Sequence, residues 1–344
     1  MFILIPQKMD QEGKLLYEIN YYISDIPKAL LNALRRTILG DLYSLSIDTV
    51  SYDVYSQDHP IFIQTTTTRL GLIPIKTSEY VLNKLLSVEE CMIEDEPCKG
   101  CSKCGIPFSI NGTWANFEKL YPEKSKEEFK KFYCNFDVYS QDIQIDKQWQ
   151  NLVRIDESCM NIPIMKFTKF QSMICKGYIR KGNGNIHAKW NSASAVTIIE
   201  IDDHQPKNQN QKPNSFLFSI DPIGNLDGKD IFPMAMKYLK SKIQGYIDQF
   251  KSLNLKMKPV GPNYYEIEFN EDSTFGQLLF AYTILNPAII SCGYNLPYPS
   301  ENFIYFHLHL PNDNQDNNNN PNDILVYHLE QIILDLALLK SKIQ

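Results

Sequence analysis

The 344-residue sequence has no long hydrophobic run, no excess of basic residues and no recognisable catalytic motif. A membrane span requires about 18 to 20 apolar residues, whereas the first apolar run, FILIP, is short and has no basic residues before it. The formal net charge is -6, from 34 basic and 40 acidic side chains, so the surface as a whole does not attract nucleic acid. We therefore expect a soluble protein that is neither secreted nor inserted in a membrane.

Motifs of the common enzyme classes are also missing. The sequence contains no G-x-S-x-G, no GxxxxGK and no H-E-x-x-H. The six histidines do not cluster with the cysteines, and His307 and His309 share one face of an expected strand, which is typical of a sheet surface. A reactive-cysteine enzyme has little support because the sequence places no base beside a thiol. We predict that the protein has no catalytic residues of its own.

Cysteine is scarce, with eight residues in all, yet four of them lie in CMIEDEPCKGCSKCG, residues 91–105. Cysteines of a non-secreted protein are kept reduced, so a cluster indicates a metal site rather than disulfides. Three thiolates on one loop and a fourth from upstream can complete a closed tetrahedral zinc site of structural type. The predicted ligands are Cys91, Cys98, Cys101 and Cys104.

An iron–sulfur cluster and unliganded thiols are the alternatives for this segment. A ferredoxin-type run would place its fourth cysteine where Phe108 stands, and the Cys-Pro ending is absent. Zinc is therefore the favoured metal. The remaining cysteines are scattered and are expected to be small buried apolar residues. They are Cys134, Cys159, Cys175 and Cys292.

The segment SDIPKALLNALRRTILGD, residues 24–41, predicts an amphipathic helix that Gly40 ends in a left-handed conformation. At 3.6-residue spacing it has one apolar face. That face consists of Leu30, Leu31, Leu34 and Ile38. The polar residues that point away from it are Asn32, Arg35 and Arg36. Taken alone, such arginines are typical of a solvated surface.

The runs SIDTVSYDVYS and IFIQTTTT alternate in the manner of strands, and RLGLIPI suggests a strand that meets a turn. From Cys91 to about Trp190 the composition changes, which indicates a module inserted into another domain. This module contains a basic patch suited either to phosphate or to a charged hairpin turn. The patch consists of Lys176, Arg180, Lys181, His187 and Lys189.

Two similar arrangements of strands and helices follow. SFLFSIDPIGNL predicts a strand, and residues 229–253 predict a long helix. Its expected buried positions are Ile231, Met234, Tyr238 and Leu239. Residues 264–270 and 303–310 then predict strands, a helix begins near a capping box of Thr274 and Gln277, and residues 322–344 predict a last helix. Before that helix lies a low-complexity, Asn-rich loop.

In their order, these strings resemble one family of multisubunit DNA-directed RNA polymerase subunits. NALRRTILG, RLGLIPI, the cysteine cluster, HAKWNSASAV and FLFSIDPIGNL are similar to the third-largest subunit of eukaryotic RNA polymerase II and to its archaeal counterpart, the D-type subunit. The C-terminal NEDSTFGQLLFAYTILNPAIISCGYNLPYP resembles the archaeal L-type subunit. A single chain that joins both is similar to the fused subunit of large cytoplasmic DNA viruses.

The resemblance implies an α+β fold with two polymerase α-type dimerisation units, each an antiparallel sheet packed by helices, paired within one chain. It also implies an inserted β-rich domain that carries zinc. The expected domains are a first part of the D-like unit (1–50), the insert (51–200), the second part of the D-like unit (201–255) and the L-like unit (256–344). Residues 252–262 would link the two units.

The same resemblance assigns subunit-interface residues. Asn32, Arg35 and Arg36 match the family's N-A-L-R-R helix and would face the second-largest polymerase subunit, so the resemblance reverses the solvated-surface interpretation. The other interface residues that it implies are Arg69, Gly71, Pro74, Lys189, Trp190, Thr274, Gly276, Gly293, Tyr294 and Pro297. The four clustered cysteines resemble the family's zinc cysteines, with Cys91 further from its neighbour than usual. The sequence departs from the family's motifs at Thr68, Ser273, Phe275 and Tyr298.

The implied function is that of a non-catalytic assembly platform, which gathers the two largest polymerase subunits and a small subunit similar to the archaeal N-type subunit. Little direct DNA contact and no membrane contact are expected. The protein would act in the host cytoplasm and virion if viral, and in the nucleus otherwise. The alternative is a free-standing, zinc-binding regulator of transcription that binds nucleic acid, which the basic patch favours and the net charge of -6 opposes.

Overall fold

The structure is a computed structural model of the chain that describes residues 2–9, 15–56, 60–93, 96–129, 131, 134–201, 215–252, 257–297, 303–311 and 320–343. It consists of two compact units. The first contains Met1–Leu39, Ala195–Asp221 and Lys229–Gln344, and the second contains Gly40–Ser194 and Pro222–Gly228. No helix in the described ranges is long and apolar enough to cross a membrane. Most of the Asn-rich loop, and Tyr298, lie outside these ranges.

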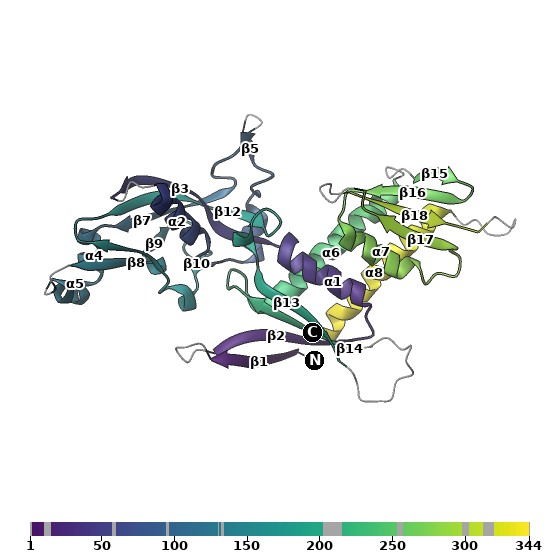
Figure 1. Cartoon of the computed structure of the whole chain (residues 1–344), viewed down its shortest axis with the longest axis horizontal. Helices are drawn as coiled ribbons and strands as arrows, with labels where there is room; N and C mark the ends of the chain where they lie inside the picture. Colours follow the sequence, from purple (N-terminus) through teal and green to yellow (C-terminus); the bar gives the residue numbers. More distant parts are fainter. Residues whose placement is uncertain are drawn as a thin grey trace. The chain divides into compact units, whose positions relative to one another are not determined.

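One sheet of the first unit has the strand order β1-β2-β14-β13 (Figure 1). Its strands are β1 (Phe2–Met9), β2 (Leu15–Ser24), β13 (Ala193–Glu200) and β14 (Ser215–Pro222). The strand predicted from SFLFSIDPIGNL is thus confirmed as β14. Antiparallel pairing sets Tyr21 of β2 opposite Phe218 of β14, and both side chains are buried.

The long helix α6 (Gly228–Lys251) covers this sheet. The ring of Phe232 stacks on Tyr21, with centroids 4.5 Å apart, and meets Phe218 edge to face at 4.9 Å. Ile231 and Leu239 are buried as predicted, whereas Met234 and Tyr238 are only half-buried. The buried stripe instead passes through Ala235 and Ile243, which lie four residues from Leu239 on the same face of the helix, whereas Met234 and Tyr238 lie beside that face.

The first predicted helix is α1 (Lys28–Arg36), and all four residues of its expected apolar face are buried. Its end differs from the prediction. The chain continues as a π-helical turn, η1 (Thr37–Asp41), so Gly40 does not adopt a left-handed conformation. Instead Asn185 packs against Gly40, and a Cβ there would lie 2.5 Å from the Asn185 side-chain oxygen. Close approach, rather than a positive φ, is thus the reason for this glycine.

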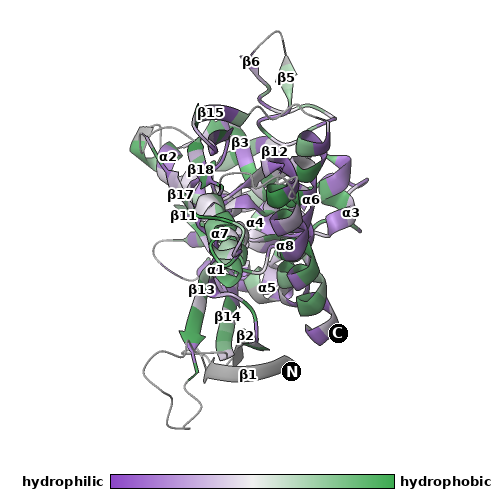
Figure 2. Cartoon of the chain, turned by 90° about the vertical axis from the view of Figure 1, so that its right-hand side faces the viewer, coloured by the Kyte–Doolittle hydropathy of each residue, from purple (hydrophilic) through white to green (hydrophobic). Residues whose placement is uncertain are grey.

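A second sheet of the first unit has the order β15-β16-β18-β17, and neighbouring strands pair antiparallel. Its strands are β15 (Met257–Gly261), β16 (Tyr264–Phe269), β17 (Ser291–Asn295) and β18 (Ile304–His309). The helices α7 (Ser273–Thr283) and α8 (Pro321–Ile343) follow β16 and β18. Apolar segments, coloured green, run along α6 and α8 beside hydrophilic ones (Figure 2). Strand β15 occupies part of the segment 252–262, which the sequence predicted to be a linker.

The helix α7 is capped by Asp272, whose carboxylate accepts hydrogen bonds from the backbone N–H groups of Thr274 and Phe275. The predicted capping box of Thr274 and Gln277 is wrong. An aspartate has a free carboxylate oxygen to accept both bonds, whereas Gln277 lies on the helix and accepts a hydrogen bond from the Tyr294 hydroxyl at 3.1 Å.

The second unit is built on a sheet of order β3-β12-β7-β9. These strands are β3 (Tyr43–Tyr55), β7 (Gly105–Gly112), β9 (Ile143–Ile145) and β12 (Met173–Asn183). Smaller strand pairs are β4 (Ile75–Lys76) with β10 (Arg154–Ile155), β5 (Met92–Ile93) with β6 (Glu96–Pro97), and β8 (Asn135–Tyr139) with β11 (Pro163–Thr168). The helices are α2 (Pro60–Gly71), α3 (Glu79–Lys84), α4 (Trp114–Leu120) and α5 (Pro122–Glu128), with the short turns η2 (Ser140–Asp142), η3 (Glu157–Cys159) and η4 (Ala188–Trp190).

The strand predicted for IFIQTTTT is wrong, because these residues belong to helix α2. Each of the four consecutive threonines donates its hydroxyl to the carbonyl four residues earlier, at 2.8 to 2.9 Å. The hydroxyls of Thr66 and Thr67 also meet the Tyr55 and Tyr52 hydroxyls of β3. These bonds satisfy the threonines inside a helix and override their preference for strands. Arg69 and Gly71 consequently end a helix rather than a strand.

The central strand β12 approaches β3 closely at Gly177. A Cβ at this position would lie 1.9 Å from the backbone oxygen of Thr49. We expect Gly177→Ala to lower the free energy of unfolding by about 2 to 3 kcal/mol, because the two strands must separate locally. Gly245→Ala, on an exposed face of α6 with no atom within 4 Å, should instead raise stability by about 0.5 to 1 kcal/mol. Urea unfolding of both variants measures the difference, and equal effects would contradict it.

Candidate functional site

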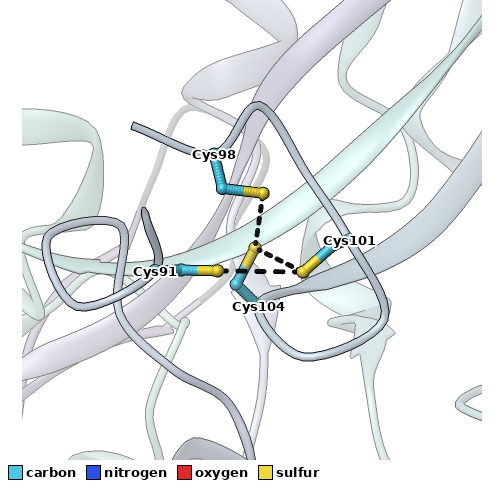
Figure 3. Close-up of side chains that lie close together, drawn as sticks. All are labelled: Cys91, Cys98, Cys101 and Cys104. Atoms are coloured by element: carbon cyan, nitrogen blue, oxygen red, sulfur yellow. Dashed lines mark hydrogen bonds between the residues drawn. The ribbon is translucent and has the colours of Figure 1, made fainter. Parts of the chain in front are cut away.

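The four clustered cysteines converge on one point of the second unit (Figure 3). Their sulfur atoms all lie within 4.8 Å of one another. The Sγ–Sγ distances are 3.7 Å for Cys91 and Cys101, 3.6 Å for Cys101 and Cys104, and 3.7 Å for Cys98 and Cys104. Cys91, which stands furthest from the others in sequence, is thus as close to them in space as they are to each other.

The local backbone explains how the segment folds around this point. The N–H of Cys98 donates to the carbonyl of Cys91 at 3.0 Å across the hairpin β5–β6. This bond brings Cys91 back to the loop although seven positions separate the two in sequence. The N–H of Gly100 donates to the Cys98 sulfur at 3.3 Å, and Gly105 N–H closes a turn on the carbonyl of Cys101 at 2.9 Å.

The cysteine loop is held against the sheet by Tyr178 of β12. A Cβ at Gly100, where φ is +134°, would lie 2.2 Å from the Tyr178 ring, and one at Gly105 would lie 2.9 Å from it. The hydroxyl of Thr49 on β3 donates to the carbonyl of Lys99 at 2.6 Å. The positions of the sulfur atoms are therefore fixed by the sheet.

This geometry fits a single metal ion. Four ligands at about 2.3 Å around a tetrahedral ion stand about 3.8 Å apart, which agrees with the observed sulfur–sulfur distances. Three of the four cysteines are buried and Cys101 is half-buried. With all four sulfur atoms bound to one ion, no tetrahedral position would remain for water. A tight group of four thiolates of this kind can bind a metal ion and serves structure rather than catalysis.

The thiols of Cys101 and Cys91 differ in pKa because of hydrogen bonding and burial. The backbone N–H of Lys103 lowers the pKa of the Cys101 thiol to about 7, whereas burial raises the pKa of Cys91 to about 12. Cys101 is therefore the thiol most readily ionised near neutral pH. Bound metal would stabilise the thiolate form of the others.

The polar residues of the N-A-L-R-R segment lie on α1, and none of them is buried. Arg35 donates from Nε to the side-chain oxygen of Asn32 at 3.0 Å. Arg36 forms an ion pair with Asp272 at 2.9 Å, and about half of each side chain is exposed. Arg36 is therefore engaged within the first unit, whereas the face formed by Asn32 and Arg35 is partly accessible.

The R-L-G-L-I-P and H-A-K-W motifs meet in the second unit. Gly71 lies against the Lys189 side chain, since a Cβ at Gly71 would lie 3.5 Å from Lys189 Cδ. Lys189 forms an ion pair with Asp48 of β3 at 2.6 Å and lies over the ring of Trp190, which is buried. Arg69 donates to the carbonyl of Ile164 at 3.0 Å and lines a cavity of about 270 Å³.

The motifs of the C-terminal part also meet. A Cβ at Gly276 of α7 would lie 2.7 Å from the Tyr294 ring of β17, so helix and strand touch at this glycine. Thr274 donates its hydroxyl to Asp272 at 2.9 Å. Gly293 has open space on its side-chain face, and Pro297 follows the end of β17. Gly293 therefore makes no close packing contact on that face within the described residues.

The basic patch is mostly neutralised within the second unit. Arg180 and Lys189 both bind the carboxylate of Asp48, and Lys176 pairs with Asp53. Lys181 donates to the carbonyl of Leu85 at 3.1 Å, and burial lowers its pKa. His187 accepts a hydrogen bond from the Lys189 backbone N–H. This arrangement favours the charged-hairpin interpretation over phosphate binding.

Sequence reasoning missed the acidic residues that organise these motifs. Asp48 stands in an ordinary alternating strand, and no local pattern marks it as the partner of two distant cations. Asp272 could have been recognised, because an aspartate before Ser-Thr is a common helix cap. Glu271 is 8% exposed and binds Lys242 of α6, a contact that requires the tertiary fold.

Comparison with known proteins identifies relatives of the chain. Residues 22–243 match the model of the RNA polymerase Rpb3/Rpb11 dimerisation domain. The chain is similar to the DNA-directed RNA polymerase subunit Rpo3 of Picrophilus torridus, with 31% identity over 189 residues, 52% of this chain and 58% of that protein. It is also similar to the DNA-directed RNA polymerase II subunit rpb3 of Dictyostelium discoideum, with 26% identity over 196 residues, 56% of this chain and 57% of that protein.

A third relative is the polymerase subunit Rpo3 of Pyrobaculum calidifontis, with 27% identity over 265 residues, 66% of this chain and 90% of that protein. For the other two relatives, the match spans little more than half of the relative's length. The family match ends at residue 243, within α6, so β15 to β18 and the helices α7 and α8 lie beyond it.

Removal of the Asp48 carboxylate, which Arg180 and Lys189 share, should destabilise the second unit. Arg180 is 5% exposed, so Asp48→Ala leaves a buried cation without its partner and should cost about 3 kcal/mol of unfolding free energy. The matched control is Asp53→Ala on the same strand, whose partner Lys176 is exposed, and it should cost at most about 1 kcal/mol. Chemical denaturation tests both. A cost for Asp53→Ala as large as that for Asp48→Ala would contradict this account.

The cysteine cluster should bind about one metal ion per chain. Cys98→Ser and Cys91→Ser should each reduce the bound metal severalfold, since each removes one of four ligands. Cys292→Ser, which changes a thiol of β17 far along the sequence, should leave it unchanged. Elemental analysis by mass spectrometry provides the measurement. Full retention of metal by the Cys91→Ser protein would remove that residue from the ligand set.

Proposed function

The chain belongs to the RNA polymerase Rpb3/Rpb11 dimerisation-domain family, and on this premise we propose that it is a non-catalytic assembly subunit of a DNA-directed RNA polymerase. The observation that carries the proposal is the family match over residues 22–243, which includes α1 and most of α6. Relatives named as the polymerase subunits Rpo3 and rpb3 support it. The protein would contribute contacts to the enzyme rather than catalytic groups.

We further propose that residues 257–343 are an L-like half that pairs with the D-like half in the same chain. Support comes from the first unit, where both parts are packed together. Tyr246 of α6 contacts the rings of Phe269 and Phe275, with centroids 5.3 and 5.0 Å apart. In this proposal, a dimerisation surface that another chain would otherwise cover is covered by the same chain. Such a fusion resembles the fused polymerase subunit of large cytoplasmic DNA viruses, which would place the protein in the host cytoplasm and virion.

The partners proposed are the two largest polymerase subunits, mainly the second-largest, and a small subunit similar to the archaeal N-type subunit. Asn32 and Arg35 form the partly accessible face of α1, so they are the first residues proposed for contact. The interface would extend over the other matched motif residues of each unit. Direct DNA contact is not part of the proposal.

Zinc is the proposed metal of the cysteine cluster. The four sulfur atoms, within 4.8 Å of one another, suit one ion and leave little room for the several irons and sulfides of a cluster. Cysteine thiolates in a tetrahedral set favour zinc among the common structural metals. The ion would hold the hairpin β5–β6 and the cysteine loop on the sheet.

The alternative, a free-standing regulator that binds nucleic acid, rests mainly on the basic patch. Its arginine and lysines are paired with Asp48, Asp53 and a backbone carbonyl. Because counterion release requires cations free to meet phosphates, this pairing favours the assembly function.

Purification of the tagged chain from its native source tests the function. We expect the two largest polymerase subunits to be recovered with it. Arg35→Glu should reduce recovery of the second-largest subunit about tenfold, since reversal of an interfacial charge costs more than about 1.4 kcal/mol. Lys126→Glu on α5, a charge change at an exposed i, i+3 pair, is the control. Recovery of the chain alone with bound nucleic acid would refute the proposal.

A further inference from the structure

The first unit contains an internal interface between two parts of the chain. One part, here called the basic face, consists of the helices α1 and α6. The other, here called the C-terminal half, consists of residues 257–343. Apolar contacts join them, since Tyr246 and Phe250 of α6 both pack on Phe269 of β16. Apolar contacts are non-directional, so they do not by themselves decide which surface pairs with which.

Among the residues that the structure describes, three ion pairs join α1 or α6 to the C-terminal half, and all three have the same polarity. Arg36 of α1 binds Asp272 at 2.9 Å. Lys242 of α6 binds Glu271 at 2.5 Å, and Lys251, at the end of α6, binds Glu330 of α8 at 3.1 Å. In each pair the cation belongs to the basic face and the carboxylate to the C-terminal half.

The central pair is the least exposed to water. The Glu271 side chain is 9% exposed and that of Lys242 is 28% exposed. The Tyr246 hydroxyl donates to the other carboxylate oxygen of Glu271 at 3.0 Å, so both oxygens have a partner. Burial raises the pKa of Glu271, and Lys242 opposes that rise. A carboxylate held here without a cation would be strongly disfavoured.

A contact of opposite polarity lies beside this interface, between α8 and the residues that precede α1. Lys342 of α8 lies 3.9 Å from Asp25 and donates to the carbonyl of Ser24. The side chains of Lys342 and Asp25 are 45% and 70% exposed. This pair is longer than the other three, and it is largely exposed, as are Arg36–Asp272 and Lys251–Glu330, so solvent and salt screen all of these exposed pairs. The polarity of the interface therefore rests mainly on the shielded pair Lys242–Glu271, which the two exposed pairs of the same polarity accompany.

We propose that this segregation of charge determines pairing specificity. The basic face binds the acidic edge of a C-terminal half, which consists of Glu271, Asp272 and Glu330, and it rejects a second basic face. Two basic faces brought together would place their lysines against like charges, as would two acidic edges. Like-charge contacts across an interface disfavour wrong pairings, and opposite charges favour the right one. The inference rests on the proposed function in one respect, since it takes residues 257–343 as the pairing partner.

Charge reversal in the full-length chain tests the proposal. One variant, K242E/K251E, makes both sides of the interface acidic, and another, E271K/E330K, makes both sides basic. Asp272 stays unchanged because it also caps α7. A third variant carries all four substitutions and restores opposite charges with reversed polarity. Thermal unfolding and light scattering after size-exclusion chromatography are measured for each variant and for a refolded equimolar mixture of the two double variants.

Each double variant alone should unfold several degrees below the unchanged chain. The fourfold variant should recover most of that loss as a monomer. The mixture should form a 1:1 complex of two chains. The basic face of the E271K/E330K chain would hold the acidic C-terminal half of the K242E/K251E chain, and the acidic helix face of the K242E/K251E chain would hold the basic C-terminal half of the E271K/E330K chain. Double variants as stable as the unchanged chain, a fourfold variant without recovery, or a mixture without the complex would each overturn the proposal. The assay contains no other polymerase component, so failure of the proposed function would leave its result intact.

Discussion

The first unit depends on one constraint: helix α6 has buried apolar side chains from its first turn to its last, and different sheets cover its two ends. Near its start, Phe232 packs between Tyr21 and Phe218 of the first sheet. Near its end, Tyr246 and Phe250 pack on Phe269 of the second. A helix of 24 residues is about 36 Å long, more than one small sheet covers. Exposure of either end would leave a large apolar surface in water.

The sequence predicted elements best where one periodic pattern ran without interruption. The apolar face of α1, the strand β14 and the helices α6 and α8 follow from spacing alone. It failed where contacts between elements decided the outcome. The threonines of α2 favour a strand until their hydroxyls bond to the preceding turn and to Tyr52 and Tyr55. On α6 the buried face runs through Ile231, Ala235 and Leu239, and Met234 lies beside it; an apolar residue next to the face could not be told from one on it by composition.

At the candidate site, too, local spacing predicts some features, whereas others depend on contacts between distant elements. Three of the four candidate metal ligands, Cys98, Cys101 and Cys104, follow from their spacing, since a tight loop must bring them together. Convergence of Cys91 required the hairpin β5–β6, which no composition signal indicates. Asp48, which two cations from β12 and η4 share, required the register of β3 against β12. Long-range partners of this kind are invisible to any window of sequence.

The position of α6 in the chain has a consequence for synthesis. The helix ends at Lys251, and the strands and helices that cover Tyr246 and Phe250 come later in the same chain. During translation this aromatic end therefore emerges before its cover exists, and its exposure lasts only until residues through α7 have left the ribosome. Because cover and helix share one polypeptide, they are always produced in equal amounts. No surplus of either can accumulate, so the interface needs neither a matched expression level nor a diffusive search.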